Sequence, residues 1–552
     1  MLMFIAVILE VLGIGMIIPI LAFMADPDIM EKNVALSSFL ISIGSPSRMQ
    51  IIVTTMLVLS FIYLIKVLFL VYLSWKKANF VYRTQEKLSY KLYSTYLHQP
   101  YTFHLQHNSG QSVNTVHSEV AEASFSLLHL INLMIESFVV IGILILLIFL
   151  EPLGAFSMLA IFGLAGYLFY SYIKTRLEYW GGERYFHSGM CVQHLQQGLG
   201  GIKDVKLLGL EQGFLAQFLP HNKGKVEMSM RQNIVESLPR LWFELLAVIG
   251  LSVLVGVMAW QNKVASEMIP IIGVFAAAAF RLIPSSTQIL NNLQSIKFSR
   301  VVVKRINSEL KLDLSHDRGT IASFPFKHSI ELSQVYYSYS SSNEHALRDI
   351  NLSIQKNTTV GFIGTSGSGK TTLIDIILGL LSPQSGGIKI DGRNIQTNLR
   401  GWQNKIGYVP QSIFLIDASL RQNIAFGIDS EKINEAQVQS AAKFAQLDEF
   451  VEKLPDGLDT IVGERGVRLS GGQKQRIGIA RALYHNPEII VLDEATSALD
   501  NATERDVMRP INQLKNKTIL IIAHRLDSLR NCDTVFRLEN GVIVEQVDPI
   551  DL

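Results

Sequence analysis

The chain has 552 residues, more than one ordinary domain holds, so at least two domains are expected. Hydrophobic residues make up 49% of it and charged residues 17%, and the mean hydropathy is +0.28. The formal net charge of +2 is close to neutral, which gives no indication of a nucleic-acid partner. The composition therefore favours a protein that is partly embedded in a membrane.

Long apolar runs are confined to the first three hundred residues. A helix that crosses a bilayer needs about 20 mostly apolar residues. Six runs reach that length, and the first has neither a basic start nor a cleavage site, so it is predicted to be a span rather than a signal peptide. The predicted transmembrane helices cover residues 2–24, 51–75, 126–150, 153–173, 241–260 and 268–289.

Lysines and arginines gather in two connections, after the second and after the fourth span. Because these residues are enriched on the cytoplasmic side, both connections and both termini are predicted to lie there. The two connections have a helical pattern, with turns near 107–115 and 200–208 that we expect to form short helices docking on a following domain. The sequence thus predicts a multi-pass protein of the inner (plasma) membrane whose C-terminal domain is cytoplasmic.

The C-terminal half has the pattern of an α/β domain. Strands are predicted over 330–338, 346–354 and 359–363, and an apolar helix over 372–381. Between the last strand and the helix lies a glycine-rich loop whose backbone N–H groups and following helix N-terminus suit phosphates. Its predicted nucleotide-binding residues are Gly364, Thr365, Ser366, Gly367, Ser368, Gly369, Lys370, Thr371 and Thr372. Lys370 is expected to reach the β- and γ-phosphates of ATP, and the Thr371 hydroxyl to bind Mg²⁺.

A second acidic element follows further along the chain. The apolar strand predicted over 489–492 ends in Asp493 and Glu494. A carboxylate at a strand end beside a phosphate-binding loop suits a Mg²⁺ ligand, and this role is predicted for Asp493. Glu494 is predicted to polarise the water that attacks the γ-phosphate. Without the loop upstream, the pair would be interpreted as an ordinary strand end.

Between these elements lies Leu469-Ser-Gly-Gly-Gln473, and with it the C-terminal half resembles the ATP-binding cassette (ABC) family. The resemblance implies that Tyr339 stacks on adenine, that Gln411 serves catalysis and the metal, and that His524 is the switch histidine. It also implies that Asp500, in Ser497-Ala-Leu-Asp500, lies in the loop joining two active sites. In this family each ATP lies between the phosphate loop of one domain and the segment matching Ser470, Gly471, Gly472 and Gln473 of another.

One cassette behind six spans resembles half of an ABC exporter. The predicted fold class is a membrane α-helical domain plus an α/β P-loop ATPase domain of the ABC type. Its predicted divisions are a transmembrane domain over 1–300, a linker over 301–326 and a nucleotide-binding domain over 327–552. Because the expected catalytic elements all have their residues, a homodimer with two working sites is predicted. Relative to the family, the chain starts inside the first span and stops about a helix early, so trimmed ends or a misassigned start are expected.

Charged residues inside apolar spans are costly and are candidates for a functional role. Arg281 lies near the middle of the sixth span, Lys66 lies in the second, and Arg240 borders the fifth. The membrane half also resembles bacterial flippases of lipid-linked oligosaccharides, through Glu10-Val-Leu-Gly-Ile-Gly and Phe280-Arg-Leu-Ile-Pro284 among others. That resemblance implies that the three cations bind the pyrophosphate of a lipid carrier. Helix-end positions or pairing with a glutamate are the structural alternatives.

Two other functions are left open by the sequence. A lipid or hydrophobic-drug exporter could use the same scaffold. An ATP-gated channel or regulatory ABC protein belongs to a different class, but the expected hydrolytic residues and the lack of a regulatory segment disfavour it. The leading prediction is an ATPase that translocates a lipid-linked, polyprenyl-pyrophosphate oligosaccharide, with ATP and Mg²⁺ as cofactors and membrane lipids as surroundings.

Overall fold

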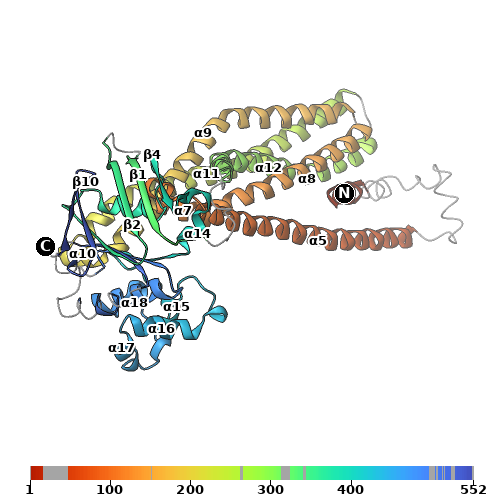
Figure 1. The fold of residues 1–552 in the computed structure, drawn as a ribbon. Coiled ribbons are helices and arrows are strands. Elements are labelled where there is room, and N and C mark those ends of the chain that lie inside the picture. Colours follow the sequence, from red (N-terminus) through yellow and green to blue (C-terminus); the bar gives the residue numbers. More distant parts are fainter. Residues whose placement is uncertain are drawn as a thin grey trace. The chain divides into compact units, whose positions relative to one another are not determined.

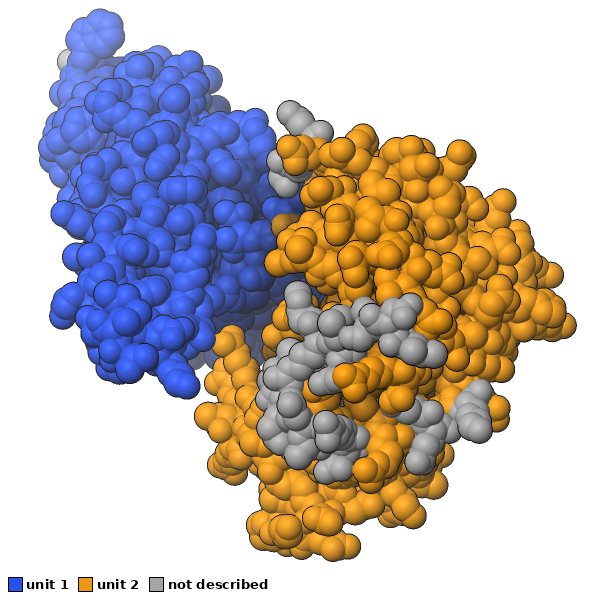
Figure 2. Space-filling model, turned by 60° about the vertical axis from the view of Figure 1, so that its left-hand side comes forward, with its two compact units in different colours: residues 1–99, 106–313 blue, residues 100–105, 314–552 orange. Residues whose placement is uncertain are grey.

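The computed structural model divides the chain into two compact units, coloured separately in Figure 2. The first comprises Met1–Gln99 and Gln106–Asp313, and the second comprises Pro100–Leu105 and Leu314–Leu552. The structure describes residues 2–15, 48–150, 152–261, 265–312, 324–339, 344–495, 504, 508–511, 514, 516–523 and 529–549.

The first unit is built from long helices (Figure 1). They are α1 (Leu2–Gly15), α5 (Arg48–Leu97), α7 (Ser109–Asn114), α8 (Val120–Leu150), α9 (Pro152–Gly200), α10 (Ile202–Leu208), α11 (Glu211–Trp260) and α12 (Ala265–Glu309). A turn of π-helix over Thr115–Glu119 joins α7 to α8 without a break. The six-residue helix α6 (Tyr101–Gln106) falls almost wholly in the second unit.

Five helices in the described residues are long and apolar enough to cross a membrane. They contain the second to sixth predicted spans. A 50-residue helix such as α5 or α11 is about 75 Å long, whereas the hydrocarbon core of a bilayer is about 30 Å thick, so these helices extend well beyond a membrane. Of the first predicted span, residues 2–15 are helical and residues 16–24 lie outside the described part of the chain.

Polar pairs join α8 to α12 at regular intervals along their interface. The α12 partners are spaced seven residues apart, which places them on one face of the helix. The pairs are Ser285 with Glu136 (2.6 Å), Asn292 with His129 (2.9 Å) and Ser299 with Ser126 (2.6 Å). Beyond the Ser285–Glu136 pair, apolar side chains such as Val139, Ile143 and Leu282 form a buried core. The polar pairs therefore favour one register of the two helices.

The second unit holds two β-sheets. An antiparallel sheet has the order β2-β1-β4-β5, with β1 (Ser329–Tyr337), β2 (Leu347–Gln355), β4 (Ser385–Ile390) and β5 (Arg393–Asn394). A six-stranded sheet has the order β10-β9-β3-β8-β7-β6. It comprises β3 (Thr359–Ile363), β6 (Ile406–Val409), β7 (Ile489–Asp493), β8 (Thr518–Ile522), β9 (Thr534–Glu539) and β10 (Val542–Val547), all parallel except β10.

Helices complete the unit's core. They are α13 (Lys370–Ile377), α14 (Leu399–Gln403), α15 (Leu420–Ile424), α16 (Glu435–Phe444), α17 (Asp448–Glu452) and α18 (Gly471–Leu483). Helix α18 packs against β6 of the six-stranded sheet, and α15 and α16 pack on α18. Strands β7 and β8 are buried along their whole length, as expected of central parallel strands. Trp402 is fully buried, and its indole N–H donates to the Ile377 carbonyl, 2.8 Å away.

Both ends of the predicted linker over 301–326 fall inside ordered structure. Helix α12 continues to Glu309, so the first part of the linker is helical. Phe324 and Phe326 are buried, and both rings lie edge-on to Trp402 in the second unit. The two units meet in the chain between Asp313 and Leu314.

Candidate functional site

The glycine-rich loop begins at the end of β3 and leads into α13. Gly364, Gly367 and Gly369 have φ values of 153°, 82° and 102°, in the region that side chains rarely adopt. A Cβ on Gly364 would lie only 2.2 Å from the Leu538 carbonyl oxygen. Only glycine fits this turn, which brings successive backbone N–H groups to the N-terminus of α13. Such an arrangement suits the phosphates of a nucleotide.

Lys370 is the first residue of α13, and its side chain folds back into the loop. The Nζ atom donates to the carbonyl oxygens of Gly364 and Thr365, both at 2.9 Å, and lies 3.5 Å from the Ser368 Oγ. Burial lowers the pKa of Lys370, while the nearby carboxylates of Asp493 and Glu494 act in the opposite direction. The ammonium group is thus held among backbone oxygens at the centre of the loop, where it can pair with phosphate oxygens.

The remaining loop residues differ in exposure. Thr365, Ser366 and Gly367 are exposed at the tip, as is Thr371 one residue after the lysine, whereas Ser368 and Thr372 are buried. The Thr372 hydroxyl shares a hydrogen bond of 3.0 Å with the hydroxyl of Tyr339. Tyr339, predicted to stack on adenine, is thereby tied to α13, and its ring lies edge-on to that of Tyr337, 5.1 Å between centroids.

Asp493 ends β7, two strands away from β3 in the same parallel sheet. The carboxyl ends of parallel strands meet at one edge, so Asp493 and the loop share that edge. Asp493 is 6% exposed, and its Oδ2 accepts a hydrogen bond from the Tyr408 hydroxyl at 3.1 Å. Burial raises the pKa of Asp493; Glu494 acts in the same direction, and Tyr408 and Lys370 oppose it.

Glu494 follows directly, in a left-handed conformation with φ of 48°. Such a φ is uncommon outside glycine and concentrates at functional sites. The Glu494 Oε2 accepts a hydrogen bond of 2.5 Å from the Gln411 Nε2. Gln411, from the segment after β6, therefore contacts Glu494 at the end of β7, some eighty positions later in the sequence. Asp493 directly precedes Glu494.

The residues predicted to hold Mg²⁺ are Thr371, Gln411 and Asp493. Each of these three side chains carries an oxygen atom that can coordinate a metal, and oxygen is the ligand atom that Mg²⁺ prefers. No group of three or more His, Cys, Asp or Glu residues that could hold a metal occurs in the described residues. Mg²⁺ is usually bound in proteins through one or two carboxylates together with nucleotide phosphates and water, and Asp493 is the carboxylate predicted for it here.

Ser470, Gly471, Gly472 and Gln473 form the N-terminus of α18. Ser470 is the N-cap: its Oγ accepts from the Gln473 backbone N–H at 3.3 Å, and its own N–H donates to the Gln473 Oε1 at 2.8 Å. These two hydrogen bonds form a capping box, in which Ser470 and Gly471 are exposed and Gly472 and Gln473 are half-buried. The predicted residues Asp500 and His524 lie outside the described residues.

Two family models match the chain. A model described as "ABC transporter" matches residues 347–497, and one described as "ABC transporter transmembrane region" matches residues 28–280. A protein named ATP-dependent lipid A-core flippase from Cupriavidus pinatubonensis is 30% identical over 83% of this chain and 78% of its own. The chain belongs to the ABC transporter family.

Two further similarities bear on this ABC transporter. A protein of the same name from Alkalilimnicola ehrlichii is 35% identical over 65% of this chain, which covers 61% of that relative's length. The structure of a bacterial Atm1-family ABC exporter with ATP bound aligns with 99% of this chain and 94% of its own, with a TM-score of 0.81 and 22% identity, so the two share a fold. The predicted exporter-type half-transporter, with its membrane domain fused to its ATP-binding domain, is confirmed.

This assignment confirms the predicted fold class, and at the level of the family it confirms an ATPase coupled to transport. It also confirms a multi-pass membrane protein and a domain that binds ATP. The identity of the bound metal, the transported molecule and the partner subunit stay predictions.

In the membrane unit of the ABC transporter, Arg281 lies beside a glutamate. Its Nη2 is 3.7 Å from the Glu136 Oε2 on α8, and the Ser285 hydroxyl donates to the same oxygen at 2.6 Å. Arg240 pairs with Glu244 of its own helix at 3.0 Å. The structural alternative considered for these arginines, an acidic partner, is therefore present for both.

The other cations have different surroundings. The ammonium group of Lys66 lies 4.7 Å from the centre of the Tyr63 ring. Arg240 and Glu244 also line a pocket of about 470 Å³ with Phe280 and Pro284 of α12. Arg281 and Lys66 are not among the residues that line this pocket. Arg240 therefore shares a pocket with residues that lie next to Arg281 in the sequence of α12. Lys66 instead lies over an aromatic ring of its own helix.

Two residues of the nucleotide site escaped the sequence interpretation. Tyr408 contacts Asp493, and Asp375 of α13 is 9% exposed behind the same carboxylate. Burial, reinforced by the charge of Asp493, raises the pKa of Asp375 to about 6. A signal was available for Asp375, because a single acidic residue stands in the otherwise apolar stretch after the loop. Tyr408 lies three residues before Gln411, in the sequence Tyr408-Val-Pro-Gln411.

Proposed function

We propose that this protein is an ATP-driven exporter that works as a homodimer and flips a lipid-linked oligosaccharide with a polyprenyl-pyrophosphate carrier. The observation that carries the motor part is the convergence of Lys370, Asp493, Glu494 and Gln411 at one sheet edge. The relatives named as lipid A-core flippases support a lipid substrate. The pyrophosphate carrier rests on the basic side chains of the membrane unit.

The hydrolytic step follows from the geometry of the sheet edge. The loop and Lys370 would hold the phosphates, and Asp493 and Thr371 would hold Mg²⁺, which would neutralise charge on the phosphate oxygens. Glu494, steadied by Gln411, orients a water toward the γ-phosphate. The segment 470–473 of a second copy closes the site from the other side. Ser470 lies at the exposed start of the otherwise largely buried helix α18, where a second copy could reach it.

The first test concerns hydrolysis. Glu494→Gln preserves the size of the side chain but removes the charge that orients water, so ATP binding persists while turnover falls by about 10²-fold or more. Equilibrium binding of a fluorescent ATP analogue and phosphate release are measured on the same preparation. Gln411→Glu, which places two carboxylates side by side, serves as a second variant. ATPase activity close to wild type in Glu494→Gln would refute the role given to Glu494.

The second test concerns the substrate. An anionic pyrophosphate can compete with Glu136 for Arg281, since charge pairing is strong where water is scarce. Arg281→Ala should therefore abolish flipping of a fluorescent polyprenyl-pyrophosphate saccharide in proteoliposomes, while basal ATPase persists. Arg281→Lys should retain part of the flipping because the charge is kept but not the fork of donors.

The control for this test is the structural alternative. If Arg281 serves only to neutralise Glu136, Arg281→Ala lowers the melting temperature and the double change with Glu136→Gln restores both melting temperature and flipping. Arg231→Ala is the matched control on α11, because it removes an arginine that pairs with Glu227 of its own helix and is not one of the three predicted substrate cations. Normal flipping by Arg281→Ala would contradict the oligosaccharide substrate and leave a lipid or hydrophobic-drug exporter as the better proposal.

A further inference from the structure

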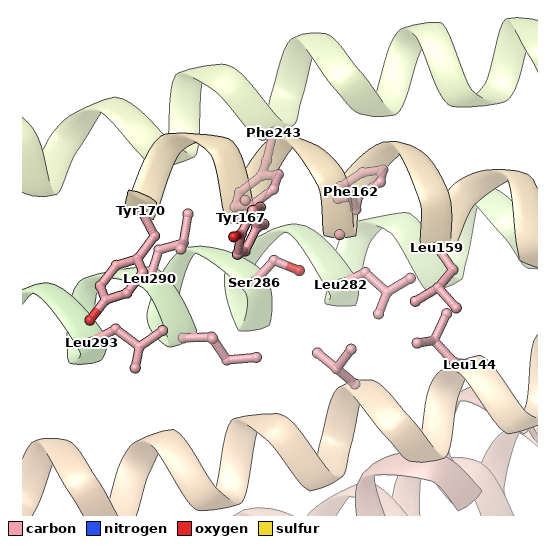
Figure 3. Close-up of a pocket in the computed structure, with 14 residues that line it drawn as sticks. Leu144, Leu159, Phe162, Tyr167, Tyr170, Phe243, Leu282, Ser286, Leu290 and Leu293 are labelled. Carbon is pink, nitrogen blue, oxygen red and sulfur yellow. The ribbon is translucent and has the colours of Figure 1, made fainter. Parts of the chain in front are cut away.

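An elongated pocket lies between α9 and α12, with contributions from α8 and α11 (Figure 3). Leu144 and Leu159 lie at one end of it, and Tyr170 and Leu293 at the other. Its volume is about 320 Å³. We call this pocket the α9–α12 slot. It lies entirely within the membrane unit.

The shape of the slot follows from the spacing of its lining residues. On α9 they run from Leu159 to Tyr170, and on α12 from Leu282 to Leu293, in each case at helical intervals along one face. Eleven residues of helix correspond to about 16 Å, so the volume spread over that length gives a mean cross-section of about 20 Å². A helix, which is about 10–12 Å across with its side chains, cannot enter so narrow a space.

The lining is apolar. None of the 14 residues that line the slot is charged, and the only side-chain oxygens belong to Tyr167, Tyr170 and Ser286. Phe162 and Phe243 stack on each other at its wall, 5.4 Å apart with 8° between their planes. The slot is partly open, since Leu159 and Tyr167 of its lining are 43% and 68% exposed, and its apolar walls suit an apolar guest. A charged headgroup would find no partner among the lining residues.

Two glycines of α9 keep the slot open. A Cβ on Gly163 would meet no atom within 4 Å, and one on Gly166 would meet only the Phe243 ring, at 3.8 Å. Both φ values are those of an ordinary helix, so the backbone does not require glycine at either position. Any larger side chain at Gly163 would extend into the empty space instead of into neighbouring protein.

We propose that the α9–α12 slot binds one acyl chain of a bilayer phospholipid. Apart from Leu290 and Leu293, which follow the sixth predicted span directly, the wall residues belong to the third, fourth and sixth predicted spans, with Phe243 in the fifth, so the medium around the slot is expected to be hydrocarbon. Only an extended, uncharged and narrow molecule matches its length, width and lining, and phospholipid acyl chains are the abundant molecules of that kind at this depth. The inference goes beyond the proposed function because it holds whichever molecule is transported.

A bound acyl chain would fill the space between α9 and α12 and could leave it again. In a bilayer, helix association rests on packing and hydrogen bonds rather than on the exclusion of water. Filling the slot supplies the van der Waals contacts that its lining lacks. Occupancy would therefore stabilise the arrangement of α9, α11 and α12 in which the slot exists.

The test uses the full chain in nanodiscs of phosphatidylcholine that contain a phospholipid with a diazirine on its acyl chain. After irradiation, mass spectrometry maps the labelled peptides. Label should concentrate on the slot faces of α9 and α12, and Gly163→Leu should lower it there by about tenfold, equivalent to about 1.4 kcal/mol. Ser286→Leu fills the slot from the opposite wall and should act alike if Gly163→Leu folds poorly.

The matched control is Gly256→Leu on α11, where a Cβ also meets no atom within 4 Å but the residue does not line the slot. It should leave the labelling unchanged. Melting temperature and basal ATPase are recorded for every variant, so a failure of the motor is distinguished from a failure of chain binding. Labelling of folded Gly163→Leu and Ser286→Leu equal to wild type would overturn the proposal. Stronger slot labelling by a diazirine isoprenoid alcohol than by the phospholipid would overturn the acyl assignment.

Discussion

Two carboxylates and a phenol crowd behind the phosphate-binding loop. Asp493 carries the metal in the proposed reaction, Tyr408 donates to it, and Asp375 is buried beside it without a role in that reaction. Because the pKa of Asp375 is raised to about 6, the native domain favours its neutral form and resists its ionisation. Above that pH the buried charge destabilises the domain.

The corresponding prediction is that Asp375→Asn stabilises the protein at high pH. The unfolded carboxyl titrates near its ordinary pKa of 3.8, so the native state holds the extra proton between that pH and about 6. Stability therefore falls as pH rises through this window and stays low above it. At about pH 8 the variant should gain about 1–3 kcal/mol in free energy of unfolding, and near pH 4 little or nothing.

Thermal unfolding of the wild type and the variant at both pH values measures this difference. Asp456→Asn, at an exposed position, is the matched control and should change neither melting temperature appreciably. A gain of equal size at both pH values would show that the introduced asparagine packs better for reasons unrelated to charge.

For single residues, the sequence was sufficient to predict the role of a side chain where the adjacent residues in the chain form a recognisable motif. Lys370, Asp493 and Glu494 stand at the ends of recognisable strands and loops. Tyr408 and Asp375 do not, because their proximity to Asp493 arises only when β6, α13 and β7 are assembled. The hydrogen bond between Gln411 and Glu494 has the same origin.

Among the elements, two helices of the ATP-binding domain begin with the same device. Ser419 and Ser470 each cap a helix through a capping box with a glutamine three residues on. The first lies at α15 and is 8% exposed, and the second lies at α18 and is exposed. Only Ser470 is proposed to contact a nucleotide, the one bound by another copy of the chain. Comparing the two serines therefore distinguishes the effect of losing an N-cap from an effect on catalysis.

Replacing these serines gives the prediction at this scale. Ser470→Ala and Ser419→Ala should each cost about 1 kcal/mol of stability, since both remove an N-cap. Ser470→Asp keeps a good N-cap and so should melt close to wild type. Its negative charge would nevertheless face the phosphates bound by the second copy, and ATPase activity should be lost. Full activity in Ser470→Asp would contradict the shared site, as would equal loss of activity in Ser419→Ala.

Element boundaries show where hydropathy stops being informative. The second to sixth spans lie inside observed helices, but those helices extend far beyond them because the extensions are polar and so invisible to a hydropathy criterion. The helix predicted over 372–381 ends at Ile377, because Gly379 takes a left-handed φ of 70° and terminates it. The short helix predicted near 200–208 is observed as α10. The turn near 107–115 is instead the start of the helix that continues into α8, with the separate helix α6 before it.

For the whole molecule, the proposed dimer requires each chain to contribute its phosphate loop to one ATP site and its segment 470–473 to the other. The phosphate loop lies at the edge of the six-stranded sheet, and segment 470–473 begins α18. If two copies pair so that each loop faces the other copy's segment, a subunit that lacks one half can still contribute the other. Complementation between defective subunits tests this arrangement directly.

The last prediction is recovery of ATPase activity in mixed dimers. Lys370→Ala removes the phosphate-binding ammonium, and Ser470→Arg blocks the segment that closes the opposite site, so each variant alone should be inactive as a homodimer. In a heterodimer both changes fall in one composite site and leave the other intact. Equal amounts of the two, differently tagged and purified in tandem, should therefore show up to about half of wild-type activity if the sites act independently.

Tandem-purified Lys370→Ala subunits that carry two different tags are the control and should stay inactive. If the two tags fail to copurify from lipid nanodiscs and each chain migrates as a monomer, the homodimer is refuted. If they copurify but only the wild type is active, hydrolysis requires both ATP sites to be intact.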